Sequence, residues 1–196
     1  MCDEHECWLP FVRFNGISSI LTPTLYVIDN AIARRAESEL LPALRTLGIA
    51  FQARSVLAGG LLSGAHMSLP APKPGSRLAG SCDKTTTDSC TGSPRYTQLF
   101  WSECYQTAVD RLALACAESD PFIEPAGAAV QWLARHSALD PVHGDSLIIG
   151  ASSVKQLNGL MTAVAATNSL PDSVLEALDA GWEQCKSGSP SPGDGW

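Results

Sequence analysis

The sequence lacks the features that direct a chain to a membrane, to secretion or to a nucleic acid. No window holds the roughly eighteen uncharged apolar residues of a membrane-spanning helix. The start, Met1-Cys2-Asp3-Glu4, has no basic residue and does not match a secretory signal. Lys and Arg number 13 against 20 Asp and Glu, which gives a net charge of −7. Because an acidic surface repels nucleic acids and anionic membranes, we expect a cytoplasmic protein that binds neither.

The cysteines lack a disulfide framework. Seven is an odd number, and their spacing is irregular. In a reducing compartment such cysteines are expected to be free thiols that mostly serve packing. Cys2, His5 and Cys7 lie together near the start, but no second ligand pair follows at zinc-like spacing. We therefore expect no metal site, and a frayed acidic terminus over residues 1–9.

The length and apolar content are those of one domain with a core of its own: 196 residues, of which 45% are apolar. Apolar strands are predicted within residues 17–27, at residues 49–53 and at residues 146–149. A helix or a glycine-rich turn follows each of them. This succession predicts an α/β fold, in which a parallel sheet is covered by outer helices.

Capping and helix-breaking residues predict where the helices begin and end. Asp29 or Asn30 is expected to cap a helix over residues 31–47, with a kink or break at Pro42. After the third strand, Ser152 or Ser153 is expected to cap the next helix. Further helices are predicted over residues 96–118, over residues 122–136 and from residue 170 onward.

The composition divides the chain into one domain and a tail. Residues 1–185 are expected to form the domain. Residues 65–95 are rich in Pro, Gly, Ser, Thr and Lys without a helical or strand period, which predicts a long surface loop. Residues 186–196 include the sequence SGSPSPGDGW, whose composition predicts a disordered tail.

The stretch GIAFQARSVLAGGLLSG, residues 48–64, is the first candidate for a binding site. The turn Ala58-Gly59-Gly60 follows the second predicted strand and leads into an apolar run. Glycine has no side chain to obstruct an anion, so such a turn exposes backbone N–H groups to phosphate. Two adjacent glycines also suit a tight turn that only joins two packed elements.

Several separated blocks give this turn a context. They are PTLYVIDNAIARRAESELLPALRTLGIAFQARSVLAGGLLSG within residues 22–64, AAVQWLARHSAL at residues 128–139, GDSLIIGASSVKQL at residues 144–157 and LPDSVLEALDAGWEQC at residues 170–185. In this order they resemble the aldo-keto reductase superfamily, most closely the aflatoxin-aldehyde reductase branch. The resemblance covers about residues 11–185.

The family fold is an eight-stranded (β/α) barrel of about 250 residues. The resemblance therefore implies an α/β fold that is a partial (β/α) TIM barrel, corresponding to about the last three strand-helix units. The inner faces of Leu25, Phe51 and Ile149 would then lack the opposing strands. Burying one such side chain contributes about 1.5–3 kcal/mol, so we expect a homo-oligomer or a protein partner to cover them.

The resemblance also implies a reaction, the reduction of a small-molecule carbonyl by NADPH with a tetrad of Asp, Tyr, Lys and His. In the family these four residues lie on earlier strands, so no residue here inherits their roles. Tyr26, Tyr96 and Tyr105 are expected to be packing or interface residues. No residue is assigned as catalytic. His66, just past the glycine-rich turn, is the remaining candidate for acid–base chemistry, while His136 matches a structural histidine of the family.

The resemblance assigns part of an NADPH site. The pyrophosphate loop of the family is matched by Leu57, Gly59 and Leu61. The turn beside the adenosine 2′-phosphate is matched by Gly150, Ala151, Ser152 and Gln156. The nicotinamide-stacking tyrosine is replaced by Arg54, the carboxamide-binding glutamine falls near Val27, and the adenine-binding asparagine falls at Leu160. Arginine can pair with phosphate but does not reproduce an aromatic stack. We therefore expect phosphate binding to be retained and nicotinamide binding to be weakened.

Two classes of function follow. The first is an NADPH-linked carbonyl oxidoreductase lineage in a truncated form that is inactive alone, and a gene model without its first exons would give the same sequence. The second is a non-reductive role in a biosynthetic pathway, as a binding partner, cyclase or isomerase. It is suggested by apolar strands that persist while cofactor-facing residues have changed.

Overall fold

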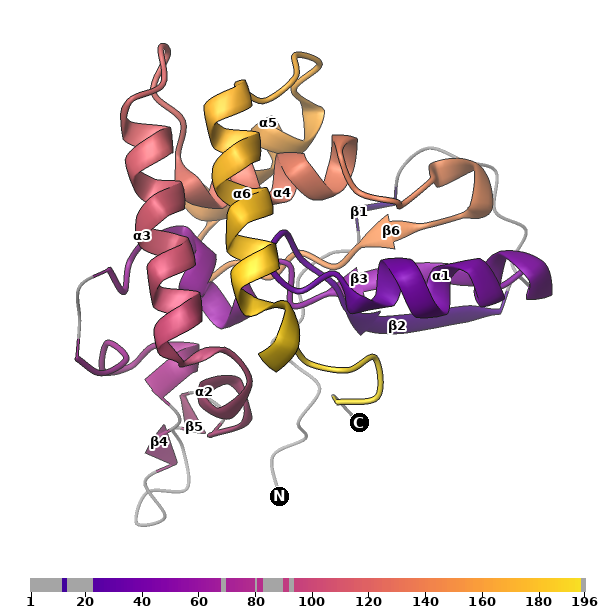
Figure 1. The fold of residues 1–196 in the computed structure, drawn as a ribbon, viewed down its shortest axis with the longest axis horizontal. Coiled ribbons are helices and arrows are strands. Elements are labelled where there is room, and N and C mark those ends of the chain that lie inside the picture. The colour runs from indigo at the N-terminus through magenta and orange to yellow at the C-terminus, as the bar shows by residue number, and fades with distance from the viewer. Residues whose placement is uncertain are drawn as a thin grey trace.

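The computed structural model describes residues 12–13, 23–67, 70–79, 81–82, 90–91 and 94–194. Figure 1 shows a small sheet at one side of the molecule, with α3 and α6 standing side by side beyond it. The strands are β1 (Val12–Arg13), β2 (Thr24–Ile28), β3 (Ala50–Arg54), β4 (Ser81–Cys82), β5 (Cys90–Thr91) and β6 (Ser146–Leu147). The α-helices are α1 (Arg35–Leu47), α2 (Pro94–Phe100), α3 (Glu103–Ala117), α4 (Pro125–Arg135), α5 (Val154–Ala165) and α6 (Asp172–Cys185). Short 3-10 helices are η1 (Ala58–Ser63), η2 (Arg77–Ala79), η3 (Pro141–His143) and η4 (Lys186–Gly188).

The main sheet has the strand order β1-β6-β3-β2. β2 and β3 are parallel, with Leu25 opposite Phe51, and β6 is parallel to β3, with Leu147 opposite Ala53. β1 pairs antiparallel with β6 at one edge, and β4 and β5 form a separate antiparallel pair. The three predicted strands are therefore parallel neighbours, as expected when each crossover returns the chain to the same end of the sheet.

One face of the sheet forms the floor of the core. Val27, Phe51, Ala53 and Leu147 are each exposed by 1% or less. They share one cluster with buried leucines of α1 and residues of α4, and α1 runs alongside β2 and β3 (Figure 1). None of the helices in the described residues has the length and apolar character needed to cross a bilayer.

The expectation that Leu25, Phe51 and Ile149 lack cover is wrong for two of the three. Phe51 and Ile149 are 0% and 1% exposed, and Leu25 is half-buried. They are buried because helices of the same chain pack on them within the single core cluster. The uncovered side chains therefore no longer argue for an oligomer or a protein partner, and such a partner stays a prediction.

Helix α1 begins four residues later than predicted. Asn30 and Ala33 exchange two backbone hydrogen bonds, of 3.2 and 3.0 Å, and the Asn30 Oδ1 accepts one from the Ile32 N–H at 3.2 Å. Asn30 thus closes a turn, and the residue at the N-cap is Arg34 rather than Asp29 or Asn30. The helix continues through Pro42, which lies on its exposed side. The predicted break is therefore wrong.

The single helix predicted over residues 96–118 is two helices. α2 ends at Phe100 and α3 begins at Glu103, because Ser102 has an extended backbone with φ −141° and ψ 163°. The change of direction lets Phe100 and Tyr105 both reach the core, where their rings meet edge to face at 5.6 Å.

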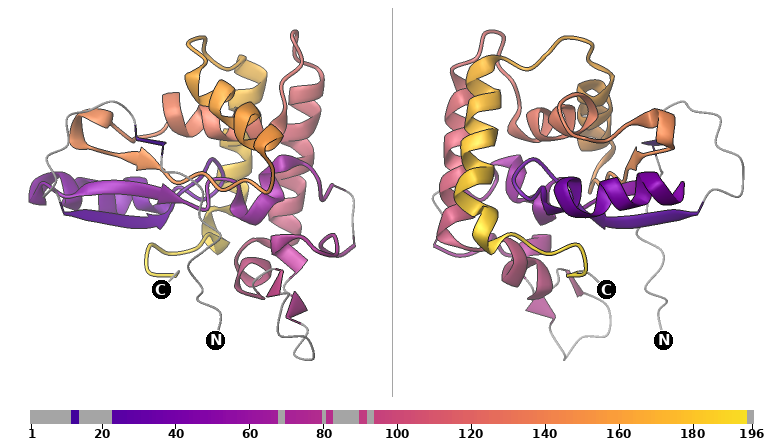
Figure 2. Two further views of the ribbon diagram at one scale, coloured as in Figure 1. Left: turned by 180° about the vertical axis from the view of Figure 1, so that it is seen from behind. Right: turned by 45° about the vertical axis from the view of Figure 1, so that its right-hand side comes forward.

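Helices α3 and α6 lie side by side, as the right-hand view of Figure 2 shows. A Cβ atom placed on Gly181 of α6 would lie 3.0 Å from the Cβ of Ala108 and 3.3 Å from the Cγ2 of Ile32. Two small residues therefore set the spacing between these helices.

The predicted loop and tail contain anchored residues. In the loop, His66 and Leu78 are 5% and 0% exposed, and the Thr97 hydroxyl donates to the Leu78 carbonyl. In the tail, Ser189 is buried, and the Arg35 Nη1 donates to the Ser191 Oγ at 3.1 Å. These described residues of the tail thus contact the rest of the chain, and the disorder expected from residue 186 onward stays a prediction.

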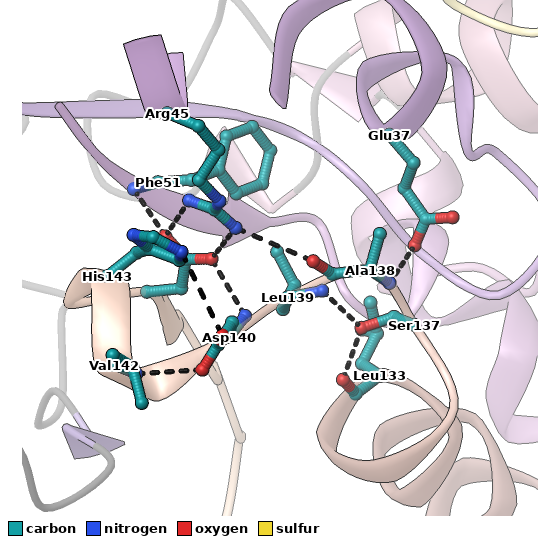
Figure 3. Close-up of polar contacts among 11 residues, drawn as sticks. Glu37, Arg45, Phe51, Leu133, Ser137, Ala138, Leu139, Asp140, Val142 and His143 are labelled. Carbon is teal, nitrogen blue, oxygen red and sulfur yellow. Dashed lines mark hydrogen bonds and ion pairs between the residues drawn. The ribbon is translucent and has the colours of Figure 1, made fainter. Parts of the chain in front are cut away.

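A single carboxylate, that of Asp145, joins α1 to the amino ends of β3 and β6. Three of its partners, Arg45, Phe51 and Asp140, are labelled in Figure 3. Its oxygens pair with the Arg45 guanidinium, Nη1 to Oδ1 at 3.0 Å and Nη2 to Oδ2 at 2.5 Å. They also accept from the N–H groups of Phe51 and Asp140, both at 2.9 Å. Since Asp145 is 3% exposed, these bonds replace the water that a buried charge requires.

Asp145→Ala is expected to lower the free energy of unfolding by about 3–5 kcal/mol, because Arg45 and two N–H groups would lose their acceptor. Asp179→Ala is the matched control. It removes an ion pair of 2.7 Å to Arg34, but the Asp179 side chain is 64% exposed, and we expect a loss below about 1 kcal/mol. Urea unfolding curves of both variants measure the difference, and equal losses would contradict the role given to Asp145.

Candidate functional site

The carboxyl ends of β2, β3 and β6 define the candidate site. Because the three strands are parallel and adjacent, the segments that follow them leave from the same edge of the sheet. Those segments hold Asp29 and Asn30, the glycine-rich turn after Arg54, and the turn that begins at Gly150. In open parallel sheets this edge is the usual place for ligands.

The glycine-rich turn has a left-handed backbone at several positions. Gly59 and Gly60 have φ values of +70° and +99°, and the non-glycine residues Ser55 and Ala58 have φ values of 58° and 50°. Left-handed torsion at a non-glycine residue costs about 1–2 kcal/mol. Such strain is found most often at functional sites.

The ring of Tyr96 covers Gly59. A Cβ atom on Gly59 would lie 2.7 Å from the Tyr96 Cδ1, and the Tyr96 hydroxyl is 3.1 Å from the Ser55 Oγ. Tyr96 is thus a packing residue, as predicted, but it occupies the space that the sequence assigns to an anion at Gly59. At Gly60 a Cβ would meet no described atom within 4 Å, so there is room beside the backbone, while the Gly60 N–H itself is donated to the Leu57 carbonyl.

The two leucines assigned to the pyrophosphate loop serve packing. Leu61 is 1% exposed, and Leu57 is partly buried against the core. The Leu57 carbonyl accepts from the N–H groups of Gly60 and Leu62, at 2.8 and 3.2 Å. Neither leucine side chain is therefore available to a ligand, and the N–H groups of Gly60 and Leu62 are already donated within the turn.

The turn after β6 is exposed and ordered by its own side chains. The Gln156 Oε1 accepts from the Ser152 N–H at 3.0 Å and from its hydroxyl at 2.7 Å. Ser153 caps α5 by accepting from the Gln156 N–H at 3.3 Å. Gly150, Ser152 and Gln156 are exposed and Ala151 is half-buried, so this predicted group lies together at the start of a helix.

His66 has the contacts of a packing residue. Its Nδ1 accepts from the Lys73 N–H at 3.2 Å, and its ring meets Trp101 edge to face at 5.9 Å. Burial, and after it the charge of Lys73, lowers the pKa of His66. The imidazole is therefore neutral near pH 7 and holds the loop, while a catalytic role for His66 stays a prediction.

Asp29, which the sequence suggests only as a helix cap, is the most unusual acid of the fold. It is fully buried, and neither carboxylate oxygen has a hydrogen-bond partner among the described residues. Burial and then the charge of Glu37 raise its pKa well above the usual range, against a smaller lowering by Arg34. The signal in the sequence is an acid placed directly after the apolar strand LYVI.

Arg54 ends β3 with its charge only partly solvated. Its Nε and Nη2 atoms are buried without a hydrogen-bond partner in the described part of the chain. Its Cζ lies 5.9 Å from the centre of the Tyr26 ring. At this departure from the family pattern the guanidinium thus has an aromatic neighbour and two donors without an acceptor among the described residues.

Metal binding finds no support in the described residues, where no three His, Cys, Asp or Glu side chains are placed to hold an ion. The group Cys2, His5 and Cys7 lies outside the described residues. Cys104, Cys116 and Cys185 are free thiols. Burial raises the pKa of Cys116 to about 11, so this thiol stays protonated at neutral pH.

Gly59→Ala is expected to destabilise the protein through both its left-handed torsion and its contact with Tyr96. In a Tyr96→Ala background only the torsional part remains. The double-mutant cycle should therefore give a coupling energy of about 0.5–3 kcal/mol, measured by urea unfolding. Additive losses would show that the ring does not restrict this position.

Asp29→Asn is expected to stabilise the protein at neutral pH. The folded state keeps the Asp29 proton to a higher pH than the unfolded state, whose carboxyl has a pKa near 3.9. The contribution of Asp29 to stability is therefore most favourable below about pH 4 and falls as the pH rises toward the folded-state pKa, by about 1.4 kcal/mol for each pH unit that separates the two pKa values. The asparagine side chain of the variant does not titrate, so its gain over wild type should vanish near pH 4.

Unfolding free energies at pH values of about 4 and 7 measure this effect. Glu39→Gln is the control, because Glu39 is an exposed acid of α1. A gain from Asp29→Asn that does not change with pH would contradict the buried, protonated state.

The chain is similar to known proteins over most of its length. The model of the family described as "Aldo/keto reductase family" matches residues 20–183. Aflatoxin B1 aldehyde reductase member 2 of Homo sapiens is 32% identical over 169 residues, covering 83% of this chain and 44% of that protein. Oxidoreductase sirO of Leptosphaeria maculans is 32% identical over 172 residues, covering 87% and 48%.

A solved structure shows the same fold. The glycerol dehydrogenase AKR11B4 from Gluconobacter oxydans superposes with a TM-score of 0.51 at 21% identity, covering 88% of this chain and 45% of that one. The chain spans about half the length of the relatives it matches. From the family match over most of its length, the chain belongs to the aldo-keto reductase family, in the aflatoxin-aldehyde reductase-like branch.

Proposed function

We propose that the chain supplies the part of an NADPH-linked carbonyl reductase that holds the adenosine and phosphate end of the cofactor, on the last three strand-helix units of a barrel. One observation carries the proposal. The open backbone at Gly60 and the exposed turn at Gly150 follow neighbouring parallel strands, so both lie at one sheet edge. A dinucleotide with phosphates at both ends of its adenosine half can contact both turns.

The turn after β6 fits a phosphate. A Cβ on Gly150 would meet no atom of the described chain within 4 Å, which leaves room at the backbone. The N-terminus of the twelve-residue helix α5 supplies N–H groups and a partial positive charge. Lys155, in the first turn, is exposed and adds a full positive charge. The Ser152 hydroxyl beside them donates to the Gln156 Oε1 at 2.7 Å, and it would exchange that bond for one to a phosphate.

The nicotinamide end fits poorly. Arg54 stands where the family has a stacking aromatic ring, and a guanidinium does not favour a ring that becomes cationic. Tyr96 over Gly59 narrows the path between the two ends. When bound, NADPH supplies a hydride, but no residue of this chain matches the family's proton-donating tetrad. Without a positioned acid the rate falls by about 100- to 10,000-fold, so we propose no reductase activity from these residues alone.

The phosphate fit is tested with adenosine 2′,5′-bisphosphate, which lacks the nicotinamide. We expect the wild-type chain to bind it in calorimetry and Ser152→Asp to weaken binding at least tenfold, because the added charge repels phosphate. Ser173→Asp is the matched control, since Ser173 is an exposed serine near the start of another helix, α6. An unchanged affinity in Ser152→Asp, or no binding by wild type, would remove the proposal.

The absence of turnover is a separate measurement. Purified chain with NADPH and an aliphatic or aromatic aldehyde should show no oxidation of NADPH at ordinary enzyme rates. Oxidation at those rates would show that a residue outside the family pattern provides the proton.

Asp29 favours a second candidate function, non-reductive acid–base catalysis of the kind an isomerase or cyclase needs. A buried carboxyl with a raised pKa keeps its proton to a higher pH than an ordinary aspartic acid and can therefore act as a proton donor. The two functions separate by ligand binding, because a cooperative unfolding transition without affinity for adenosine 2′,5′-bisphosphate favours the second.

A further inference from the structure

The edge of the Arg54 guanidinium formed by Nε and Nη2 has no acceptor among the described residues. These two atoms lie on one side of the planar group and point the same way, which is the arrangement that grips two oxygens of one oxyanion. Both are buried. A buried donor without an acceptor costs about 1–3 kcal/mol, so a ligand that supplies oxygens there is favoured.

Positive charge gathers around this edge in a chain whose net charge is −7. Burial is the largest cause that lowers the pKa of Arg54, and the charge of Arg95 lowers it further, while Tyr96 and Tyr26 act in the opposite direction. The Cζ of Arg77 lies 5.8 Å from the centre of the Tyr96 ring. No acidic side chain among the described residues forms an ion pair with Arg54. Arg54 therefore has no carboxylate of the described residues to neutralise it, which favours an anionic ligand.

The backbone beside Arg54 is held in a strained form. Ser55 has a φ of 58°. Its carbonyl accepts from the Asn30 Nδ2 at 3.2 Å, and its hydroxyl bonds the Tyr96 hydroxyl at 3.1 Å. Contacts from two distant segments therefore fix the residue that follows Arg54, as expected where a side chain is kept in position for a ligand.

We propose that the Nε/Nη2 edge of Arg54 binds the phosphate group of a small phosphate ester, at a site separate from the adenosine-phosphate turn after β6. Tyr26 lies on the edge strand β2, is 45% exposed and flanks the guanidinium at 5.9 Å, so a ligand that reaches this edge from solvent would have to displace its ring. The site does not depend on cofactor binding. Arg54 replaces the stacking residue of the family with a group that holds a charged ligand in that place.

The test uses inorganic phosphate as the probe, titrated into the chain and followed by ³¹P NMR and by melting temperature. Wild type should bind phosphate at one saturable site, also in the presence of saturating adenosine 2′,5′-bisphosphate. Arg54→Met should weaken phosphate binding at least tenfold while leaving the affinity for the bisphosphate unchanged. Arg135→Met, which removes an exposed arginine of α4, should bind phosphate as wild type does.

Arg54→Lys keeps the positive charge but lacks the Nε/Nη2 edge, so it should also weaken phosphate binding. This variant replaces Arg54→Met in the test if Arg54→Met does not fold. Wild-type affinity in both variants would overturn the proposal. Loss of phosphate binding when the bisphosphate is added would place phosphate at the turn after β6 and overturn it as well. Acetate that competes as well as phosphate would show a carboxylate site instead.

Discussion

The Arg45–Asp145 ion pair is the constraint on which the sheet depends. Its carboxylate is almost fully buried, and it ties one helix, one central strand and the approach to the next strand through four polar contacts. A buried pair of this kind contributes little net energy compared with an apolar replacement, but it is costly to break and selects one arrangement. It fixes the amino ends of β3 and β6 relative to each other. The positions of the segments that follow their carboxyl ends depend on this alignment of the two strands.

The carboxyl ends of the strands differ from their amino ends. At the carboxyl ends, polar groups are buried without hydrogen-bond partners in the described part of the chain. Asp29 and Arg54 both lie at this edge, one an acid without donors and the other a base whose Nε and Nη2 lack acceptors. Their side chains leave on different sides, because Arg54 lies beside Tyr26 whereas the charges that act on Asp29 are those of Glu37 and Arg34. Buried polar groups without partners weaken a fold, and they are retained mainly where function requires them.

Much of the fold could be predicted from the sequence, because period and turn chemistry act locally. The strands around Leu25, Phe51 and Leu147, their parallel order and the Ser153 cap follow from such signals. The break at Ser102 could not, because an extended serine between two helical patterns is decided by what Phe100 and Tyr105 bury. The candidate site was predicted only in part for a similar reason, since the cover of Gly59 by Tyr96 and the solvation of Asp29 and Arg54 depend on distant segments that no local pattern names.

The amide of Asn30 serves two segments at once. Its Oδ1 closes the turn that leads to α1, and its Nδ2 holds the carbonyl of Ser55. The loops after β2 and β3 are therefore linked to each other rather than independent. Because one amide bonds both loops, a ligand that displaces Ser55 would also disturb the turn before α1.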